Sequence, residues 1–212
     1  MIAPEGWVFV WVPAALGAGA LVVGWPWLGW PLIALGAFAL FFFRNPDRRC
    51  DHPPMVACSP ADGRVIVVGD APAELVERGL PQQVSVFMSV FDVHVNRAPL
   101  DGTLVEYSYN PGRKISAFKP KASLENEQNL SVWEGPHGRI AYKQIAGLVA
   151  RRIVFDHDLG ATVARGERIG LIRYGSRLDV FLPDTAEILV KVGDTVRAGR
   201  SALASLQPPA PP

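Results

Sequence analysis

The sequence predicts a mainly β domain that follows an N-terminal hydrophobic helical hairpin. Three observations support this fold class. The first 43 residues carry a single charged side chain, Glu5, whereas all 21 Lys and Arg residues lie at or after Arg44. Beyond Arg44, short β-branched and alternating apolar runs are separated by Gly, Pro and Asp-Gly turn signals. A Gly-x-x-Val-x-x-Gly turn occurs twice in the last third of the chain.

Length and composition limit the classes of protein. A chain of 212 residues fits one soluble domain plus an appendage. The net charge of +1 gives no electrostatic case for binding nucleic acid. Cys50 and Cys58 lack the spacing of metal ligands, and two cysteines alone do not suggest a disulfide scaffold. We therefore expect both cysteines to be free thiols in a reducing compartment.

Residues 6–43 form a run of 38 residues without a charge. As one helix this run would reach about 57 Å, far beyond a bilayer core of about 30 Å. The Gly-Trp-Pro-Trp sequence at 24–27 divides it into two segments, each near the lower length limit for a membrane span. Tryptophans gather at the edges and at the turn, as interfacial aromatics do. No basic region precedes the apolar run, so a signal peptide is not expected.

A helical hairpin would place Met1 and Arg44 on the same side of a membrane. Arg44, Arg48 and Arg49 then predict that this side is the cytoplasmic face of the cell membrane. Two questions stay open. The run could instead be a buried pair of core helices, and a membrane hairpin could either span the bilayer or lie within one leaflet.

The body of the chain reads as a series of strands. A turn at 58–63 leads into a strand at 64–68, and further strands are expected at 83–89 and 102–109. A hairpin joins 130–133 to 139–145. The long polar segment at 110–129 carries four basic residues and is either a solvated surface loop or a lid that attracts anionic lipid head groups.

The repeated turn comprises residues 160–166 and 193–199, which correspond at an offset of 33 residues. It resembles the hammerhead unit of biotinyl and lipoyl domains. Two interlocking copies imply a barrel-sandwich hybrid, an all-β body with few free edges. No lysine lies between 178 and 188 to carry a prosthetic group. We expect a hairpin at 1–43, a β domain at 44–206 and a disordered, proline-rich tail at 207–212.

The pair Gly175-Ser176 lies between two apolar β runs, at 170–172 and 178–181. An isolated glycine there is typical of a bulge. The whole run from 170 to 180, Gly-Leu-Ile-Arg-Tyr-Gly-Ser-Arg-Leu-Asp-Val, however, resembles the processing site of short-form phosphatidylserine decarboxylases. Residues 147–154 match the same family. The resemblance covers about residues 40–205.

The resemblance implies that the chain cuts itself between Gly175 and Ser176. A serine hydroxyl can attack the preceding carbonyl when a base activates it, and glycine has no Cβ to obstruct the approach. Elimination and loss of ammonia then leave a pyruvoyl group made from Ser176, which is the implied cofactor. This ketone condenses with a substrate amine and withdraws electrons as carbon dioxide leaves, the role of pyridoxal phosphate elsewhere.

Two further motifs carry candidate catalytic residues. Local rules make Asp62 a turn residue and His94 a satisfied core residue. The family resemblance of Pro-Ala-Asp-Gly and of Phe-x-Ser…Asp-x-His…Pro instead implies an Asp62–His94–Ser176 set, in which Asp62 orients His94. Longer bacterial members carry a second histidine at the position of Arg97. Because arginine stays protonated, Arg97 cannot be a base, and we expect it to bind the substrate's carboxylate or phosphate.

Other polar residues offer weaker candidates. Residues 126–128, Asn-Glu-Gln, resemble an Asn-Glu-Arg element of the family. Asp156, His157 and Asp158 are adjacent and point in different directions, so we expect no metal site there. His157 remains an alternative to His94 as the processing base.

The sequence therefore predicts a membrane-bound phosphatidylserine decarboxylase of phospholipid biosynthesis, made as a zymogen. Its expected partners are phosphatidylserine in the membrane and its own two cleavage chains, 1–175 and 176–212, while the oligomeric state stays open, a homo-oligomer included. Two alternatives remain. One is a pyruvoyl decarboxylase of a soluble amino acid, and the other is a membrane-tethered barrel-sandwich adaptor without catalysis.

Overall fold

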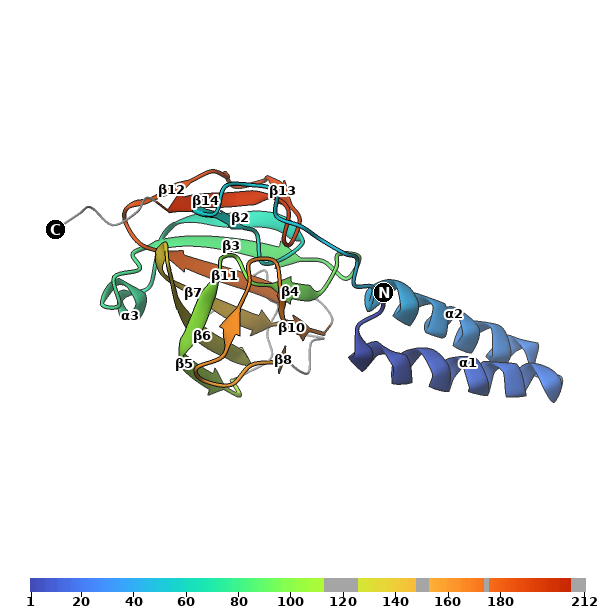
Figure 1. The fold of residues 1–212 in the computed structure, drawn as a ribbon. Helices are drawn as coiled ribbons and strands as arrows, with labels where there is room; N and C mark the ends of the chain where they lie inside the picture. The colour runs from blue at the N-terminus through green and yellow to red at the C-terminus, as the bar shows by residue number, and fades with distance from the viewer. Residues whose placement is uncertain (113–125, 148–152, 174–175, 207–212) are drawn as a thin grey trace. The chain divides into compact units, whose positions relative to one another are not determined.

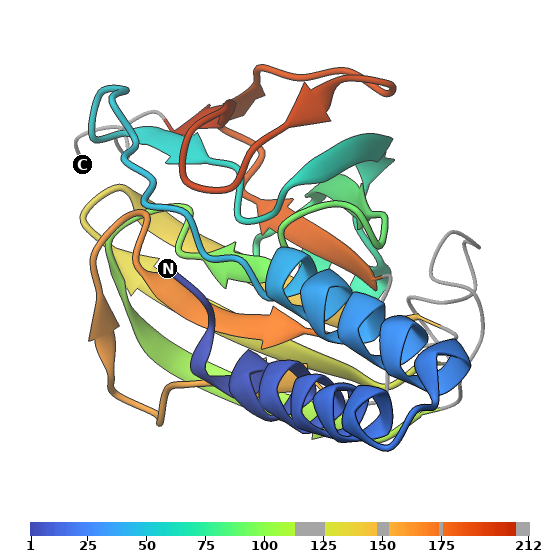
Figure 2. The same ribbon diagram turned by 90° about the vertical axis from the view of Figure 1, so that its right-hand side faces the viewer.

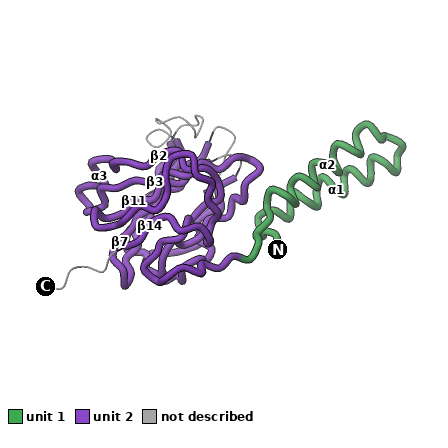
Figure 3. The backbone as a smooth tube through the Cα atoms, turned by 90° about the horizontal axis from the view of Figure 1, so that it is seen from above, with its two compact units in different colours: residues 1–47 green, residues 48–212 purple. Residues whose placement is uncertain are grey.

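The computed structural model describes residues 1–112, 126–147, 153–173 and 176–206. The chain divides into two compact units, residues 1–47 and residues 48–212 (Figure 3). Helices dominate the first unit and strands dominate the second. The predicted mainly β fold with an N-terminal helical hairpin is confirmed.

The first unit is a pair of antiparallel helices. A short 3-10 turn, Pro4–Gly6, leads into α1 (Trp7–Val22), and α2 (Pro26–Phe42) runs back beside it (Figures 1 and 2). Glycines allow this close approach. A Cβ atom on Gly17 would lie 2.9 Å from the carbonyl oxygen of Gly29, and one on Gly36 would lie 3.1 Å from that of Val10. Small residues at a helix–helix contact are typical of membrane helices.

Backbone hydrogen bonds close the open end of the hairpin. The amide of Ala3 donates to the carbonyl of Phe43 at 2.8 Å, and the amide of Asn45 donates to that of Met1 at 2.7 Å. Residues 4–22 are long and apolar enough to cross a membrane, whereas α2 is shorter. Large apolar side chains remain exposed along both helices, among them Val8, Trp11, Leu16, Trp27, Trp30 and Phe41.

The second unit contains three sheets. The eight-stranded sheet has the order β13-β2-β3-β11-β7-β6-β5-β9, and the two smaller sheets are β1-β14-β12 and β4-β10-β8. The strands are β1 (Val56–Cys58), β2 (Gly63–Asp70), β3 (Gln82–Met88), β4 (Val95–Arg97), β5 (Gly102–Asn110), β6 (Gln128–Gly135), β7 (Gly138–Ala146), β8 (Ile153–Phe155), β9 (Thr162–Val163), β10 (Arg168–Ile172), β11 (Ser176–Leu182), β12 (Ala186–Ile188), β13 (Thr195–Val196) and β14 (Ala202–Leu206).

These strands form two equivalent halves. One half comprises β1, β2, β3 and β11 to β14, and the other comprises β4 to β10. Each strand of one half has a counterpart in the other. The order of the large sheet is therefore equivalent read from either end, and the two small sheets match strand for strand. The second half is inserted in the chain between β3 and β11 of the first. The predicted repeat at 160–166 and 193–199 supplies the equivalent strands β9 and β13.

A second repeat, which the sequence reading missed, fixes the alignment of the halves. The sequence Pro-x-Asp-Gly ends at Gly63, the first residue of β2, and again at Gly102, the first residue of β5. In the first copy the amide of Ala198 donates to Oδ1 of Asp62 at 2.7 Å. In the second, the amide of Arg165 donates to Oδ1 of Asp101 at 2.7 Å. Each aspartate therefore binds the repeated Gly-x-x-Val-x-x-Gly turn of its own half.

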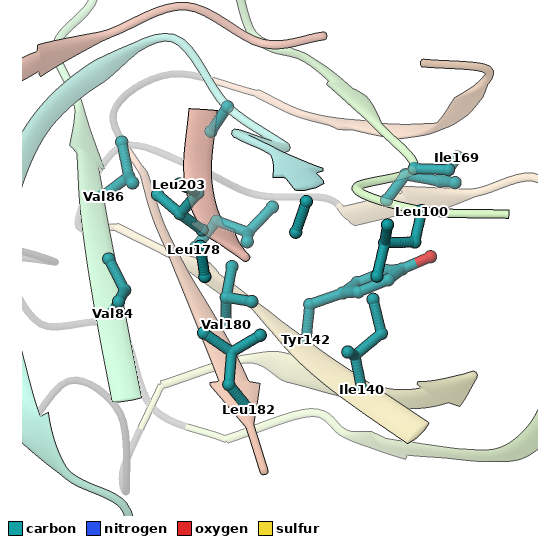
Figure 4. Close-up of a cluster of buried hydrophobic side chains, with 14 of the residues drawn as sticks. Val84, Val86, Leu100, Ile140, Tyr142, Ile169, Leu178, Val180, Leu182 and Leu203 are labelled. Carbon is teal, nitrogen blue, oxygen red and sulfur yellow. The ribbon is translucent and has the colours of Figure 1, made fainter. Parts of the chain in front are cut away.

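Apolar side chains fill the inner face of the large sheet. β11 contributes Leu178, Val180 and Leu182, and neighbouring strands add Val84, Val86, Ile140 and Tyr142 (Figure 4). Each fully buried side chain of this size stabilises the fold by about 1.5–3 kcal/mol. On the opposite face, Phe181 packs with Leu75 of the short helix α3 (Ala73–Val76) and with Leu80.

The expectation that Cys50 and Cys58 are free thiols is wrong, because the structure joins them in a disulfide. Their Cα atoms lie 6.3 Å apart, within the usual range of about 4.4–6.8 Å. Arg165 explains how they meet. Its guanidinium donates to the carbonyls of Cys50, His52, Pro53 and Val56, which folds this segment back on the start of β1. The argument for a reducing compartment therefore fails.

Candidate active site

Ser176 begins β11 in the middle of the large sheet. It pairs with Met88 of β3 on one side and with Ala146 of β7 on the other. The residue is fully buried, and its hydroxyl donates to the Sδ atom of Met88 at 3.7 Å. Gly175, the other residue of the predicted cleavage site, lies outside the described residues.

Ser176 marks a junction between the two halves of the domain. The chain leaves the first half after Met88 and returns to it at Ser176. In the other half, Gly135 corresponds to Met88 and Gly138 corresponds to Ser176, and a tight hairpin there connects β6 to β7. The site thus occupies the place of a hairpin turn, opened by the insertion of a whole half. The segment that follows Met88 starts beside Ser176, because these two residues are paired in the sheet, and this brings residues distant in sequence together.

His94 lies on the segment that leads from the end of β3 to the start of β4. It is fully buried, its Nδ1 donates to the carbonyl of Asp92 at 3.0 Å, and its own carbonyl accepts from the amide of Ile172 at 3.4 Å. The carboxylate of Asp92 accepts from the amide of Ser89 at 2.8 Å and so fixes this turn. A neutral imidazole with a proton on Nδ1 has its lone pair on Nε2. Nε2 is therefore the atom of His94 that can accept a proton.

Asp62 has other partners than the sequence predicted. Its Oδ1 accepts from the amide of Ala198, and its Oδ2 forms an ion pair with Arg48 at 2.9 Å. The role of Asp62 in orienting His94 stays a prediction, because no hydrogen bond between the two is described in this part of the chain. One carboxylate oxygen holds a turn of the fold while the other neutralises a nearly buried arginine.

Arg97 is the last residue of β4 and lies beside the turn at 160–166. Its Nη1 donates to the carbonyl of Gly166 at 2.9 Å. Because a guanidinium carries five N–H donors, this bond is compatible with a further role in binding an anion.

His157 lies elsewhere in the domain. Its Nε2 contacts the carbonyl of Arg168 at 3.0 Å, and its ring packs edge-on against Trp133. Trp133 pairs with Ile140, roughly 20 Å along β7 from Ala146, the partner of Ser176. The neighbouring Asp156 forms an ion pair with Arg168.

Residues 126 and 127, from the Asn-Glu-Gln element, hold the strand next to Ser176. Nδ2 of Asn126 donates to the carbonyl of Ala146 at 2.6 Å, and the amide of Ala146 donates to the carbonyl of Glu127 at 2.9 Å. The Glu127 carboxylate accepts from the hydroxyl of Tyr109 at 3.0 Å. These bonds fix the end of β7 against which Ser176 is placed.

Sequence reasoning missed Met88 and three buried amides that are linked to Ser176 through it, Asn96, Asn129 and Gln144, all of them fully buried. The signal for the amides was present. In strands 128–135 and 138–146, the residues Asn129 and Gln144 occupy the alternate positions that also carry Trp133 and Tyr142 of the core. An amide at a core position of a strand needs a partner inside the fold.

Comparison with known proteins identifies the family. Residues 35–204 match the family model described as phosphatidylserine decarboxylase. A protein of Magnetococcus marinus is 41% identical over 211 residues, covering 98% of this chain and 96% of its own. Proteins of Ruegeria pomeroyi, 46% identical with 96% and 94% covered, and Paramagnetospirillum magneticum, 47% identical with 95% and 85% covered, are similar as well. All three bear the name phosphatidylserine decarboxylase proenzyme, and the chain belongs to the phosphatidylserine decarboxylase family.

Proposed function

We infer that the protein decarboxylates phosphatidylserine to phosphatidylethanolamine, a step of phospholipid biosynthesis. The observation that carries this conclusion is the similarity over nearly the full length to phosphatidylserine decarboxylase proenzymes. The non-enzymatic adaptor and the decarboxylase of a soluble amino acid, which the sequence alone left open, receive no support from these comparisons.

The word proenzyme in the relatives' names denotes a precursor, and we propose that maturation is a cut between Gly175 and Ser176. The products would be chains 1–175 and 176–212, with a pyruvoyl group made from Ser176. Such a group supplies a carbonyl that withdraws electrons when carbon dioxide leaves. Its fit is supported by the burial of Ser176, which excludes water from the site. Pairing of β11 with β3 and β7 would hold the two chains together after the cut.

Geometry and charge support the remaining proposed roles. His94 is proposed as the base that takes the Ser176 hydroxyl proton, and later as the acid that protonates the substrate carbon. Its support is the orientation of the ring, with the lone pair on Nε2. Arg97 is proposed to bind the carboxylate or phosphate of the substrate, which suits the planar fork of a guanidinium.

We propose that the charge of Asp62 assists cleavage, and the chain contains a matched control for this proposal. In an Asp62→Asn variant the amide oxygen can still accept from Ala198, but the ion pair with Arg48 is lost. Asp101→Asn makes the same change at the equivalent turn, where the structure describes no ion pair. We expect Asp62→Asn to slow self-cleavage about tenfold or more, and Asp101→Asn to leave it near the wild-type rate. Densitometry of a denaturing gel over time measures both rates.

Cleavage at the wild-type rate in both variants would show that the charge of Asp62 does not assist cleavage. The same slowing in both variants would show that Asp62 serves only to hold its turn, because the two aspartates share only that structural bond.

The hairpin of residues 1–43 is proposed to attach the enzyme to the cell membrane, with residues 44–206 forming the catalytic domain. Support comes from the exposed apolar side chains of α1 and α2 and from the charge-free sequence. The basic residues Arg44, Arg48 and Arg49 favour the cytoplasmic face.

Removal of residues 1–43 should yield a protein that still cleaves itself, because Ser176 and His94 both lie beyond the hairpin. It should turn over dispersed short-chain phosphatidylserine but lose at least about tenfold in rate on vesicles, where the hairpin no longer concentrates enzyme at the surface. Carbon dioxide release on the two substrates measures the ratio. A truncated protein as active on vesicles as the full chain would show that the hairpin does not deliver substrate.

A further inference from the structure

A chain of buried carboxamides ends beside Ser176. Asn129 donates from Nδ2 to Oε1 of Gln144 at 2.9 Å, and Gln144 donates from Nε2 to Oδ1 of Asn96 at 2.7 Å. Asn96 in turn donates from Nδ2 to the Sδ atom of Met88 at 3.6 Å. That same sulfur accepts the hydroxyl of Ser176 at 3.7 Å. Three amides from β6, β7 and β4 therefore point their donors one after another toward the reacting serine.

The fold itself does not require an amide at the positions of Asn96 and Gln144. When the two halves are aligned on their turns and bulges, Ala57 takes the position of Asn96, and Leu182 takes that of Gln144. Both equivalents are fully buried and apolar. Burying a carboxamide costs free energy unless its donors and acceptors are paired, so apolar residues are the simpler solution. Asn129 differs, because its equivalent in the first half is Gln82, which is also an amide. Amides occupy all three positions only in the half that supplies Asn96, the partner of Met88.

The direction of the chain has a chemical meaning. Hydrogen bonds that follow one another in the same direction polarise each other, which strengthens the last donor. Here the last donor is Nδ2 of Asn96. Its acceptor is a thioether sulfur, which is a weak acceptor and can be exchanged for an oxygen at little cost. A polarised donor and the hydroxyl of Ser176 thus share one acceptor, and the bond that holds this donor is easily replaced.

Self-cleavage generates negative charge at this oxygen. In the first step Oγ of Ser176 gives up its proton and bonds to the Gly175 carbonyl carbon, and the C–N bond between the two residues breaks as its nitrogen takes up a proton. In the second step Cα of Ser176 loses a proton, and the Cβ–Oγ bond breaks. Oγ then departs as part of the new Gly175 carboxylate. Addition of water and loss of ammonia complete the conversion of Ser176.

We propose that Asn96, supported by Gln144 and Asn129, stabilises the carboxylate that leaves in the second step. Met88 holds both the Asn96 donor and the Ser176 hydroxyl in place until then. Asn96 contacts the departing oxygen, whereas Gln144 and Asn129 are positioning residues that act through it. The proposal rests on the proposed self-cleavage at Gly175–Ser176 and assigns the groups that drive its elimination step.

The test separates the two steps with hydroxylamine, which cuts the ester formed in the first step and leaves an unmodified serine on chain 176–212. Asn96→Asp keeps the shape and the acceptor for Gln144 but removes the donor. Asn96→Leu removes both. We expect either variant to slow pyruvoyl formation about 10²-fold, the usual effect of losing one donor to a developing oxyanion. The ester should accumulate, so that hydroxylamine releases chain 176–212 with a free serine.

Ser131→Ala is the matched control. Ser131 is also fully buried on β6, and its hydroxyl donates to the carbonyl of Tyr142 at 3.3 Å, outside the amide chain. Pyruvoyl formation in this variant should match the wild type. Thermal unfolding of each substitution, measured in a Ser176→Ala background where no cleavage is expected, reports its effect on the fold alone.

Two results would overturn the proposal. One is pyruvoyl formation at the wild-type rate in both Asn96 variants. The other is slow cleavage with no hydroxylamine-sensitive ester, which is what a general loss of stability produces. In both cases the wild-type chain is still cut. An uncut wild-type chain would instead refute the proposed self-cleavage itself, so the two failures can be told apart.

Discussion

A Ser176→Ala variant is expected to remain a single uncut chain without decarboxylase activity. Alanine has no hydroxyl to attack the Gly175 carbonyl, and no pyruvoyl group can arise from it. Because this group would supply the electron-withdrawing carbonyl, its absence should cost the whole rate enhancement, about 10⁶-fold or more. A denaturing gel and carbon dioxide release from phosphatidylserine measure the two effects.

The fold should survive this change, because among the described residues the Ser176 side chain makes one weak hydrogen bond, to the sulfur of Met88. Ser131→Ala again serves as the control, since it removes another fully buried hydroxyl from the same sheet and should be cut and active. Two chains from the Ser176→Ala variant would be incompatible with cleavage by this serine.

A His94→Ala variant should show the next largest loss of self-cleavage and activity. Loss of a general base usually costs 10²–10⁴-fold, and we expect self-cleavage to slow by about 10²-fold or more. Activity should fall with it, because the same imidazole is proposed to protonate the substrate carbon. The fraction of cut chain against time after synthesis gives the rate of cleavage. Turnover per cut chain measures the contribution of His94 to decarboxylation.

His157→Ala is the control for this experiment, since its ring packs on Trp133, toward the opposite end of β7 from Ser176. It should be cut at the wild-type rate. If His94→Ala matures fully and fails only in decarboxylation, His94 is the later acid alone. If His157→Ala fails to mature, His157 becomes the processing base.

The features that depend on local sequence were predictable. A charge-free run divided by a Gly-Trp-Pro-Trp turn specifies a helical hairpin, and Arg44 marks its end. Alternation of apolar residues predicted β3 and β11, with strand ends within one or two residues of those in the structure. The motif around Gly175-Ser176 indicated the proposed cleavage pair, because the surrounding sequence resembles the processing site of the family.

Features that depend on contacts distant in sequence were not predictable. The pairing of Cys50 with Cys58 depends on Arg165, which lies more than a hundred residues later and gathers the intervening carbonyls. The partners of Asp62 are Arg48 and Ala198, and no local sequence pattern connects either of them to Asp62. The insertion of one half of the domain into the other explains both the site's position and its composition. It became visible only once the strands were paired.

The most direct test of the account is the intact mass of the wild-type protein under denaturing conditions. We predict two polypeptides, residues 1–175 and residues 176–212, with the smaller one lighter by one ammonia than a chain that begins with an unmodified serine. A single mass for the whole chain of 212 residues, or a smaller chain that begins with an intact serine, would contradict it.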